Sequence, residues 1–232
     1  PRLSAVRGYM TMLLTDYFRS TPDVTWEFAR QCGVEHGTIR LPEDAEFDPA
    51  CWEHWRSVYK RFTGHGIRPV VVEPMPNSLH DHIKAGDAMR DECIDKVIKM
   101  FAVMDELDVR TICFNFMAYV GWTRTSSELP ERGGAKVTGF RLADYVPGNA
   151  HITEAKLWDN YAYFIKAVLP EAEKHGIKLA LHPDDPPIAK LGEVSRIMIS
   201  AENMEKAVRT VADSPSLGLT FCQATYYMMG ED

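Results

Sequence analysis

The chain has 232 residues, of which 45% are hydrophobic and 25% are charged, the ordinary balance of a globular protein rather than a disordered or fibrous one. Its formal net charge is −7, with acidic and basic residues interspersed, which argues against nucleic acid or an anionic membrane as a partner. We find no apolar run of the roughly 18 residues that a spanning helix needs, no signal-peptide pattern at the start, and no C-x-x-C pair among the five cysteines. These features predict reduced thiols and a cytoplasmic location.

Short apolar runs alternate along the chain with longer segments of helical period. Several runs are apolar on both faces, which is typical of strands in a parallel sheet that helices cover. The six predicted strands are Tyr9–Leu14, Gly37–Leu41, Arg68–Glu73, Thr111–Phe116, Lys178–His182 and Leu217–Cys222. Between them, apolar residues spaced three and four apart predict helices around Trp55, Phe101 and Phe164.

One short sequence unit occurs twice. Gly64–Arg68 leads into a strand that ends at Glu73 and a proline, and Lys174–Lys178 leads into a strand that ends at His182 and a proline. The glycine in each unit suits the left-handed residue that ends a helix. This repetition predicts an α/β fold, a TIM (β/α)₈ barrel with about six βα units present in this chain. We therefore expect one domain over residues 1–232 that lacks the last two βα units, and a longer natural protein.

Two connections, Asn77–Asp87 and Tyr119–Ala150, are long and rich in polar residues. Each follows a predicted strand, so in a barrel both would lie on the face at the carboxyl ends of the strands. Long polar loops on that face favour substrate contacts or lids, and decoration of the surface is the alternative.

Polar residues end the predicted strands, namely Glu73, Asn115, His182 and Cys222. Because parallel strands end at one face of a barrel, these side chains should point into one mouth. The run His182–Pro187 places an imidazole and two carboxylates on a proline-stiffened loop, which suits a divalent metal ion or acid–base chemistry. A proline-rich turn whose aspartates bond to backbone amides fits the same residues.

Cys222 could supply a thiolate to the same centre as His182. Two residues make half of a metal site, because three or four protein ligands are usual. Further along the strand-four loop, Trp122 could cover the site while the planar fork of Arg124 binds a carboxylate. A surface arginine lying over an aromatic ring is the alternative for this pair.

These residues also carry a family resemblance. The run HPDDPP at His182–Pro187, together with CFNFMAYVGWTRT at Cys113–Thr125, resembles sequence motifs of the mannonate dehydratases. The runs LHDHIKAG at Leu79–Gly86, Val72-Glu73, and LGLTFCQA at Leu217–Ala224 are similar to further motifs of that family, in the family order. The resemblance implies a xylose-isomerase-like TIM barrel that dehydrates D-mannonate to 2-keto-3-deoxy-D-gluconate and water in hexuronate degradation, with Mn²⁺ or Fe²⁺ as the ion.

The resemblance also implies roles for single residues. His182 and Cys222 would be two metal ligands. The predicted contacts to a small-molecule sugar acid are Glu73, His80, Asn115, Trp122, Arg124 and Asp184. No catalytic residue is assigned, because the family's remaining ligands and its proton-transfer pair would lie beyond residue 232. The partners expected are the sugar acid and further copies of the chain in a homo-oligomer.

The chain departs from the family pattern at positions that would line the pocket. Gly121 replaces an acid, His82 replaces the second of two acids, and Gln223-Ala224 replaces Thr-Gly. Two alternatives therefore stay open: a sugar isomerase or epimerase on the same barrel, and an inactive family member that only binds a sugar acid.

Overall fold

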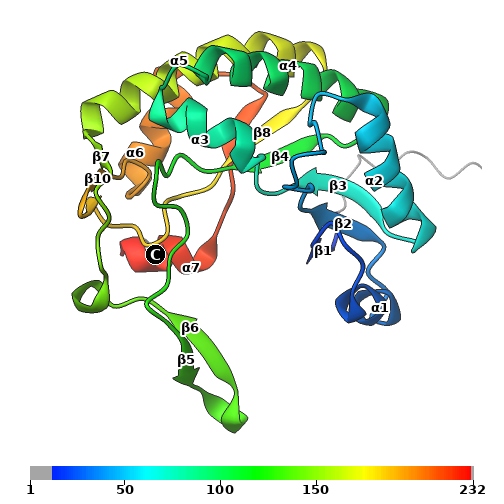
Figure 1. Ribbon diagram of the computed structural model, residues 1–232, viewed down its shortest axis with the longest axis horizontal. Helices are drawn as coiled ribbons and strands as arrows, with labels where there is room; N and C mark the ends of the chain where they lie inside the picture. Colours follow the sequence, from blue (N-terminus) through cyan, green and yellow to red (C-terminus); the bar gives the residue numbers. More distant parts are fainter. Residues whose placement is uncertain (1–11, 231–232) are drawn as a thin grey trace, which may run out of the picture.

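A six-stranded parallel sheet forms the centre of the protein in the computed structural model, which describes residues 12–230 (Figure 1). The strands are β1 (Thr15–Phe18), β2 (His36–Ile39), β3 (Arg68–Val72), β4 (Thr111–Phe114), β8 (Lys178–Leu181) and β11 (Leu217–Leu219). They lie in the sheet in the order of the chain, and every neighbouring pair is parallel. This arrangement confirms the predicted α/β fold with six units.

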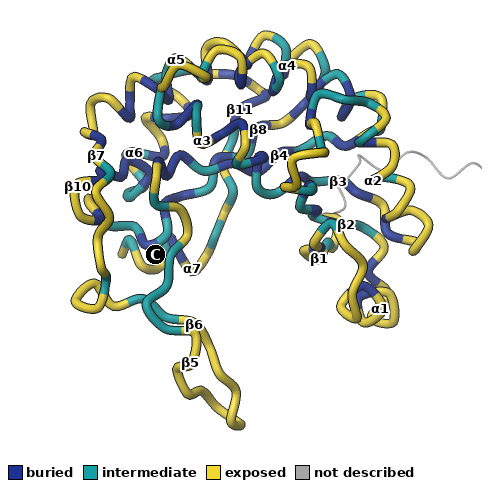
Figure 2. The backbone as a smooth tube through the Cα atoms, in the orientation of Figure 1, coloured by how far each residue is buried: buried dark blue, intermediate teal, exposed yellow. Residues whose placement is uncertain are grey.

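The long helices lie on the outer side of the arc that the sheet forms, and the short helix before the C-terminus lies on its inner side (Figure 1). The helices are α1 (Val24–Gln31), α2 (Trp52–Gly64), α3 (Asn77–Ala85), α4 (Arg90–Glu106), α5 (Glu154–Lys174), α6 (Ala201–Glu205) and α7 (Gln223–Met229), and a π-helical turn follows α6 over Lys206–Val211. Buried residues run along the sheet and the sides of the helices that face it (Figure 2). No helix in the described part of the chain is long and apolar enough to cross a membrane.

The helix α5 shows how the sequence specifies such an element. The hydroxyl of Thr153 accepts a hydrogen bond from the amide of Lys156 at 3.2 Å, which caps the first turn. Tyr161, Phe164 and Val168 share one face and are fully buried, each contributing about 1.5–3 kcal/mol. The segment turns into β8 at Gly176, whose φ of 65° is the left-handed conformation predicted for the repeated unit.

The first strand was predicted in the wrong place. The prediction was Tyr9–Leu14, whereas β1 spans Thr15–Phe18, and residues 9–11 lie outside the described residues. Leu13 and Leu14 are 56% and 73% exposed, so their apolar character does not mark a buried strand. Phe18 is the buried residue of β1, and its ring packs against Trp26 and Phe62.

The segment Asn77–Asp87 was predicted to be a loop, but most of it is the helix α3. Leu79 and Ile83, four residues apart, are buried together with His80 and Lys84, whereas Ser78 and Asp81 are exposed. Gly86 ends it in the left-handed conformation, with φ 66°.

The segment of residues 119–150 is a long connection, as predicted. It carries an exposed two-stranded hairpin of β5 (Ser126–Pro130) and β6 (Lys136–Gly139), which projects from the body of the protein (Figure 1). Short 3₁₀ turns lie at Arg132–Gly134 and Leu142–Asp144. A second small sheet of β7 (His151–Ile152), β10 (Glu193–Ser195) and β9 (Lys190–Leu191) follows.

Candidate functional site

The carboxyl ends of the sheet strands are joined by a regular series of backbone hydrogen bonds. The amide of Arg40 donates to the carbonyl of Phe18 at 2.9 Å, and that of Glu73 donates to Ile39 at 2.9 Å. The amide of His182 likewise donates to Phe114 at 2.7 Å. The first residue after a strand is therefore fixed against the neighbouring strand, which brings the side chains of Arg40, Glu73 and His182 to one edge of the sheet.

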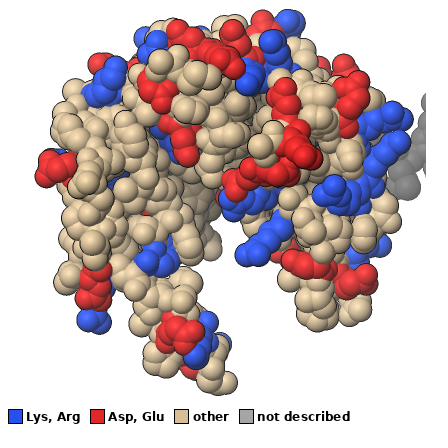
Figure 3. Space-filling model, viewed as in Figure 1, with Lys and Arg blue, Asp and Glu red and all other residues tan. Residues whose placement is uncertain are grey.

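A cavity of about 420 Å³ lies at this edge. Four of the predicted site residues line it: Glu73, Asn115, Trp122 and His182. The other lining residues are Tyr17, Arg40, Pro74, Cys113, Phe114, Met117 and Asp185. In Figure 3 the molecule is hollowed between the projecting hairpin and the half that carries α1. The strand ends thus surround one cavity at the carboxyl-terminal face of the sheet, as predicted from the sequence.

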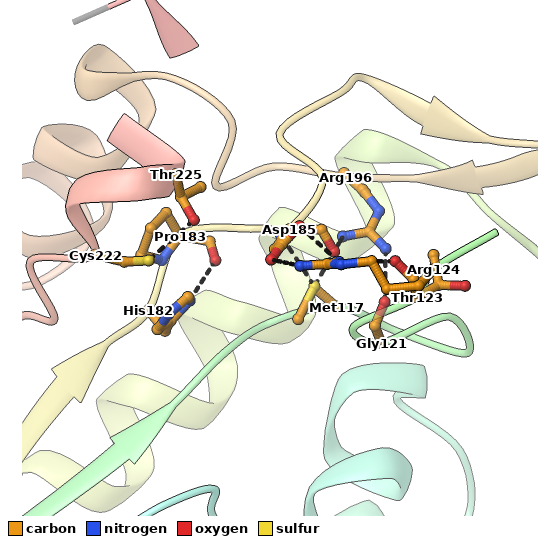
Figure 4. Close-up of polar contacts among 10 residues, drawn as sticks. All are labelled: Met117, Gly121, Thr123, Arg124, His182, Pro183, Asp185, Arg196, Cys222 and Thr225. Atoms are coloured by element: carbon orange, nitrogen blue, oxygen red, sulfur yellow. Dashed lines mark hydrogen bonds and ion pairs between the residues drawn. The ribbon is translucent and has the colours of Figure 1, made fainter. Parts of the chain in front are cut away.

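One hydrogen bond to the backbone orients the ring of His182. Its Nδ1 lies 2.6 Å from the carbonyl oxygen of Pro183 (Figure 4). Because a carbonyl oxygen only accepts, Nδ1 must donate, and in the neutral ring the lone pair is then on Nε2. A histidine that binds a metal ion is typically oriented by such a bond from its other ring nitrogen.

Cys222 lies just before α7, after the strand next to that of His182. The hydroxyl of Thr225 donates a hydrogen bond to its Sγ at 3.2 Å (Figure 4). His182 and Cys222 thus fit two ligands of a divalent ion. Within residues 12–230, however, no group of three or more His, Cys, Asp or Glu side chains is arranged to hold a metal ion.

Cys113 lines the cavity from the neighbouring strand but has a different character from Cys222. Burial raises the pKa of its thiol to about 12, and the negative charge of Glu73 adds to this effect. Its Sγ also lies 3.2 Å from the hydroxyl of Thr220. Cys113 is therefore a neutral thiol in the cavity wall rather than a nucleophile.

Arg124, whose fork was predicted to hold a substrate carboxylate, is paired within the protein in this structure. Its two Nη atoms lie 3.1 and 2.7 Å from the two carboxylate oxygens of Asp185 (Figure 4). Its guanidinium also stacks on the ring of Trp122, with the central carbon 4.0 Å from the ring centre. The bidentate geometry that suits a ligand carboxylate is thus used within the protein.

Asp184 and His80 are also buried, and neither lines the cavity. Asp184 is 0% exposed, and one of its oxygens accepts hydrogen bonds from the amides of Ile197 and Met198 at 3.1 Å each. His80 is 1% exposed and packs against Phe114, Phe116 and Phe164. Burial lowers the pKa of His80 far below its usual range, so the ring is neutral. Both side chains, which were predicted to contact the sugar acid, are thus held by internal contacts in this structure.

Arg196, which was not among the predicted site residues, joins two loops of the site. This buried side chain donates to the carbonyls of Val120 and Gly121 at 3.0 and 2.9 Å, and to that of Asp185 at 3.4 Å. Its Nη1 also lies 2.8 Å from the sulfur of Met117. A single arginine within the apolar run Val194–Met198 was the available signal, because a cation in such a run needs internal partners.

The sequence matches the family model for D-mannonate dehydratase (UxuA) over residues 10–147 and 141–232, which together cover nearly the whole chain. The chain belongs to the D-mannonate dehydratase family.

Individual relatives agree with this assignment. The chain is 33% identical over 201 residues to a mannonate dehydratase of Streptococcus agalactiae, covering 75% of this chain and 57% of the relative. It is 31% identical to the Streptococcus uberis mannonate dehydratase, covering 88% of this chain and 65% of the relative. The chain therefore spans little more than half to two thirds of the length of these dehydratases.

Solved structures place the fold in the same group. The crystal structure of mannonate dehydratase from Streptococcus suis serotype 2 superposes with a TM-score of 0.81 at 26% identity, covering 94% of this chain and 66% of that chain. A D-psicose 3-epimerase from Clostridium cellulolyticum superposes with a TM-score of 0.57 at 13% identity, covering 90% of this chain and 62% of that chain. The second likeness concerns the fold alone, and the TIM-barrel class predicted from the sequence is confirmed.

Proposed function

We propose that the protein containing this chain dehydrates D-mannonate to 2-keto-3-deoxy-D-gluconate and water. Membership of the mannonate dehydratase family supports this function. The structural observation that carries it is the cavity at the strand ends. His182, whose Nε2 is left free by the bond from Nδ1 to Pro183, lines this cavity together with Glu73 and Asn115. Hexuronate degradation in the cytoplasm, by a homo-oligomer, is the biological setting that we propose for it.

The cavity residues supply the groups that a polyhydroxy acid needs. The Glu73 carboxylate accepts hydrogen bonds from hydroxyl groups. The side-chain oxygen of Asn115 accepts from the amide of Met117 at 3.2 Å, which leaves the amide hydrogens of Asn115 to donate to the substrate. Trp122 lines the cavity and offers an apolar ring for the carbon chain of the substrate to pack against.

A metal ion belongs to the proposal as a divalent Mn²⁺ or Fe²⁺ held in part by His182 and Cys222. When bound, such an ion stabilises the negative charge that develops when a proton leaves the carbon beside the carboxylate. The chain's own part is to fix the His182 ring through Pro183 and to present the Cys222 sulfur beside Thr225.

The reaction is tested by incubating the full-length protein with D-mannonate and Mn²⁺ and assaying the 2-keto acid formed. We expect product with Mn²⁺ and none after treatment with EDTA. A parallel panel of aldoses and ketoses tests the isomerase or epimerase alternative. Absence of 2-keto acid in the presence of metal would reject the proposed reaction.

The ligand assignment has its own test. We expect His182→Ala and Cys222→Ala each to reduce the affinity for Mn²⁺ at least 10-fold, measured by titration calorimetry, because each removes a donor atom. The matched controls are His151→Ala and Cys32→Ala, which change exposed side chains. Unchanged metal affinity in both site variants would rule the assignment out.

A further inference from the structure

The cavity at the strand ends continues into a second cavity of about 340 Å³, and the two share Arg40, Pro74, Asn115, Met117 and Trp122. Among the described residues that line them, Arg40 and Lys84 are the only lysine or arginine side chains. The cationic side chains that an anionic ligand in these cavities can contact are therefore Arg40, which lines both, and Lys84, which lines the second.

Lys84 is the less usual of the two cations, because its side chain is only 4% exposed. Its Nζ lies 2.8 Å from a carboxylate oxygen of Asp81, whose own side chain is 63% exposed. An ammonium group has three donors, so this contact leaves hydrogens for a second acceptor. Asn160 also fixes the backbone here, since its side-chain amide donates to the Lys84 carbonyl at 2.9 Å.

Lys84 pairs with one exposed carboxylate, that of Asp81. His80, one turn earlier on α3, is neutral because burial and then the charge of Lys84 lower its pKa. Arg40 is in a similar position: its Nη2 lies 2.7 Å from Glu43, and the two side chains are 38% and 43% exposed. The pair of Arg40 and Glu43 is exposed on both sides and contributes little free energy. In the Lys84 pair only the Asp81 carboxylate faces solvent, so a ligand carboxylate can share the buried ammonium group with it.

The other two arginines near the site are held much more firmly. Arg124 makes its bidentate pair with Asp185, whose side chain is only 13% exposed. Arg196 is 2% exposed and is engaged with carbonyl oxygens. Neither lines the two cavities, and freeing either would leave a buried partner without its hydrogen bonds.

We propose that Arg40 and Lys84 form the subsite for the carboxylate of the sugar acid. The carboxylate then lies where the two cavities meet at Arg40, and the carbon beside it and the polyhydroxy chain lie in the cavity that Glu73 and His182 line. This inference rests on the proposed function, because it assumes a sugar-acid ligand. It assigns recognition of the anionic group to the ends of β2 and α3 instead of to Arg124.

The test compares binding of D-mannonate with binding of its uncharged amide, using titration calorimetry on the EDTA-treated full-length protein. The wild type should prefer the acid. The variants Lys84→Met and Arg40→Gln should each weaken acid binding about 10- to 100-fold and leave amide binding nearly unchanged, since each removes one charged donor. Methionine has a similar length to lysine, so the buried position stays filled.

Two further variants sharpen the test. Asp81→Asn should strengthen acid binding up to about fivefold, because it removes the carboxylate that competes for Lys84. Lys174→Met is the matched control: Lys174 also pairs with an acid three residues away, Glu171 at 2.7 Å, but on the exposed end of α5. It should leave the preference for the acid unchanged.

The outcomes separate this subsite from the proposed reaction. An unchanged ratio of acid to amide binding in both Lys84→Met and Arg40→Gln would overturn the subsite, even if the wild type forms the 2-keto acid. A ratio that collapses in both variants supports the subsite, even if D-mannonate binds without being dehydrated. A wild type that binds acid and amide equally would also overturn it.

Discussion

Cys113 and Cys32 are chemically identical side chains in different surroundings. Cys113 is 4% exposed in the cavity wall, whereas Cys32 is exposed after α1. Because the thiolate is the reactive form, a thiol whose pKa is raised to about 12 scarcely reacts near neutral pH. We expect iodoacetamide at pH 8 to label Cys32 in the EDTA-treated native protein within minutes and to leave Cys113 unlabelled, as read by peptide mass spectrometry. Equal labelling of both would contradict this assignment.

The raised pKa of Cys113 also fixes the sign of its effect on stability. Between the ordinary thiol value of 9.0 and about 12, the unfolded chain loses this proton while the folded chain keeps it. Unfolding is therefore favoured as the pH rises through that range, and the contribution of the neutral thiol is fully present below it.

At the scale of elements, Arg196 connects the loop after β4 with the loop after β8. The variant Arg196→Met removes the hydrogen bonds to the carbonyls of Val120, Gly121 and Asp185 but keeps much of the side-chain volume. Leaving such groups unpaired should cost about 2–4 kcal/mol of unfolding free energy, measured by urea denaturation. It should also raise KM for the sugar acid, because the Gly121–Trp122 segment loses its support.

The control for this variant is Arg209→Met. Arg209 pairs with Asp213 at 3.1 Å, and both side chains are more than two thirds exposed, so its loss should change stability by less than about 1 kcal/mol. If the two variants were equally stable, the joining role of Arg196 would be refuted.

Elements with strong apolar patterns could be predicted from sequence, and weakly apolar ones could not. The strands β3, β4 and β8 lie within their predicted segments because runs of consecutive apolar residues mark them. The helix α3 was missed because polar residues outnumber Leu79 and Ile83, although Gly86 was the signal for its end. The order and direction of the strands followed from the βα repeat, which allows few other arrangements.

The site was predictable to the extent that it depends on where strands end. Glu73, Asn115 and His182 reach the cavity for that reason. Arg124 and Asp184 could not be placed from sequence, since their partners lie 61 and 13 or 14 residues away along the chain. Pairing between loops depends on tertiary geometry, which a local pattern does not contain.

At the scale of the whole molecule, the opposite end of the sheet carries a network of ion pairs. Arg110, just before β4, contacts Asp105 and, at 2.9 Å, Asp108. His175 contacts Asp105 at 3.0 Å, and Arg68 contacts Asp108. The bond from His175 and then that from Arg110 hold the pKa of Asp105 below its usual range, and Arg110 does the same for Asp108. This network ties neighbouring units together far from the site.

We expect Arg110→Ala to lower Tm by about 2–4 °C and to leave sugar-acid binding unchanged. Carboxylates with lowered pKa values stabilise the fold above their unfolded pKa, and this contribution is lost as the pH falls through the folded pKa. The variant should therefore unfold at a higher pH during acid titration, followed by circular dichroism. Lys136→Ala, on the exposed hairpin, is the control and should not shift the transition. A change in binding without a change in acid unfolding would contradict the division between the two ends of the sheet.

The hairpin of β5 and β6 is attached to the body through a narrow base. The amide of Thr125 donates to the carbonyl of Gly139 at 2.9 Å, so the chain leaves and returns at nearly one point. The hairpin of residues 126–138 can therefore change in length or in sequence without displacing Trp122 and Arg124. Changes of length at this place therefore need not alter the arrangement of the side chains at the strand ends.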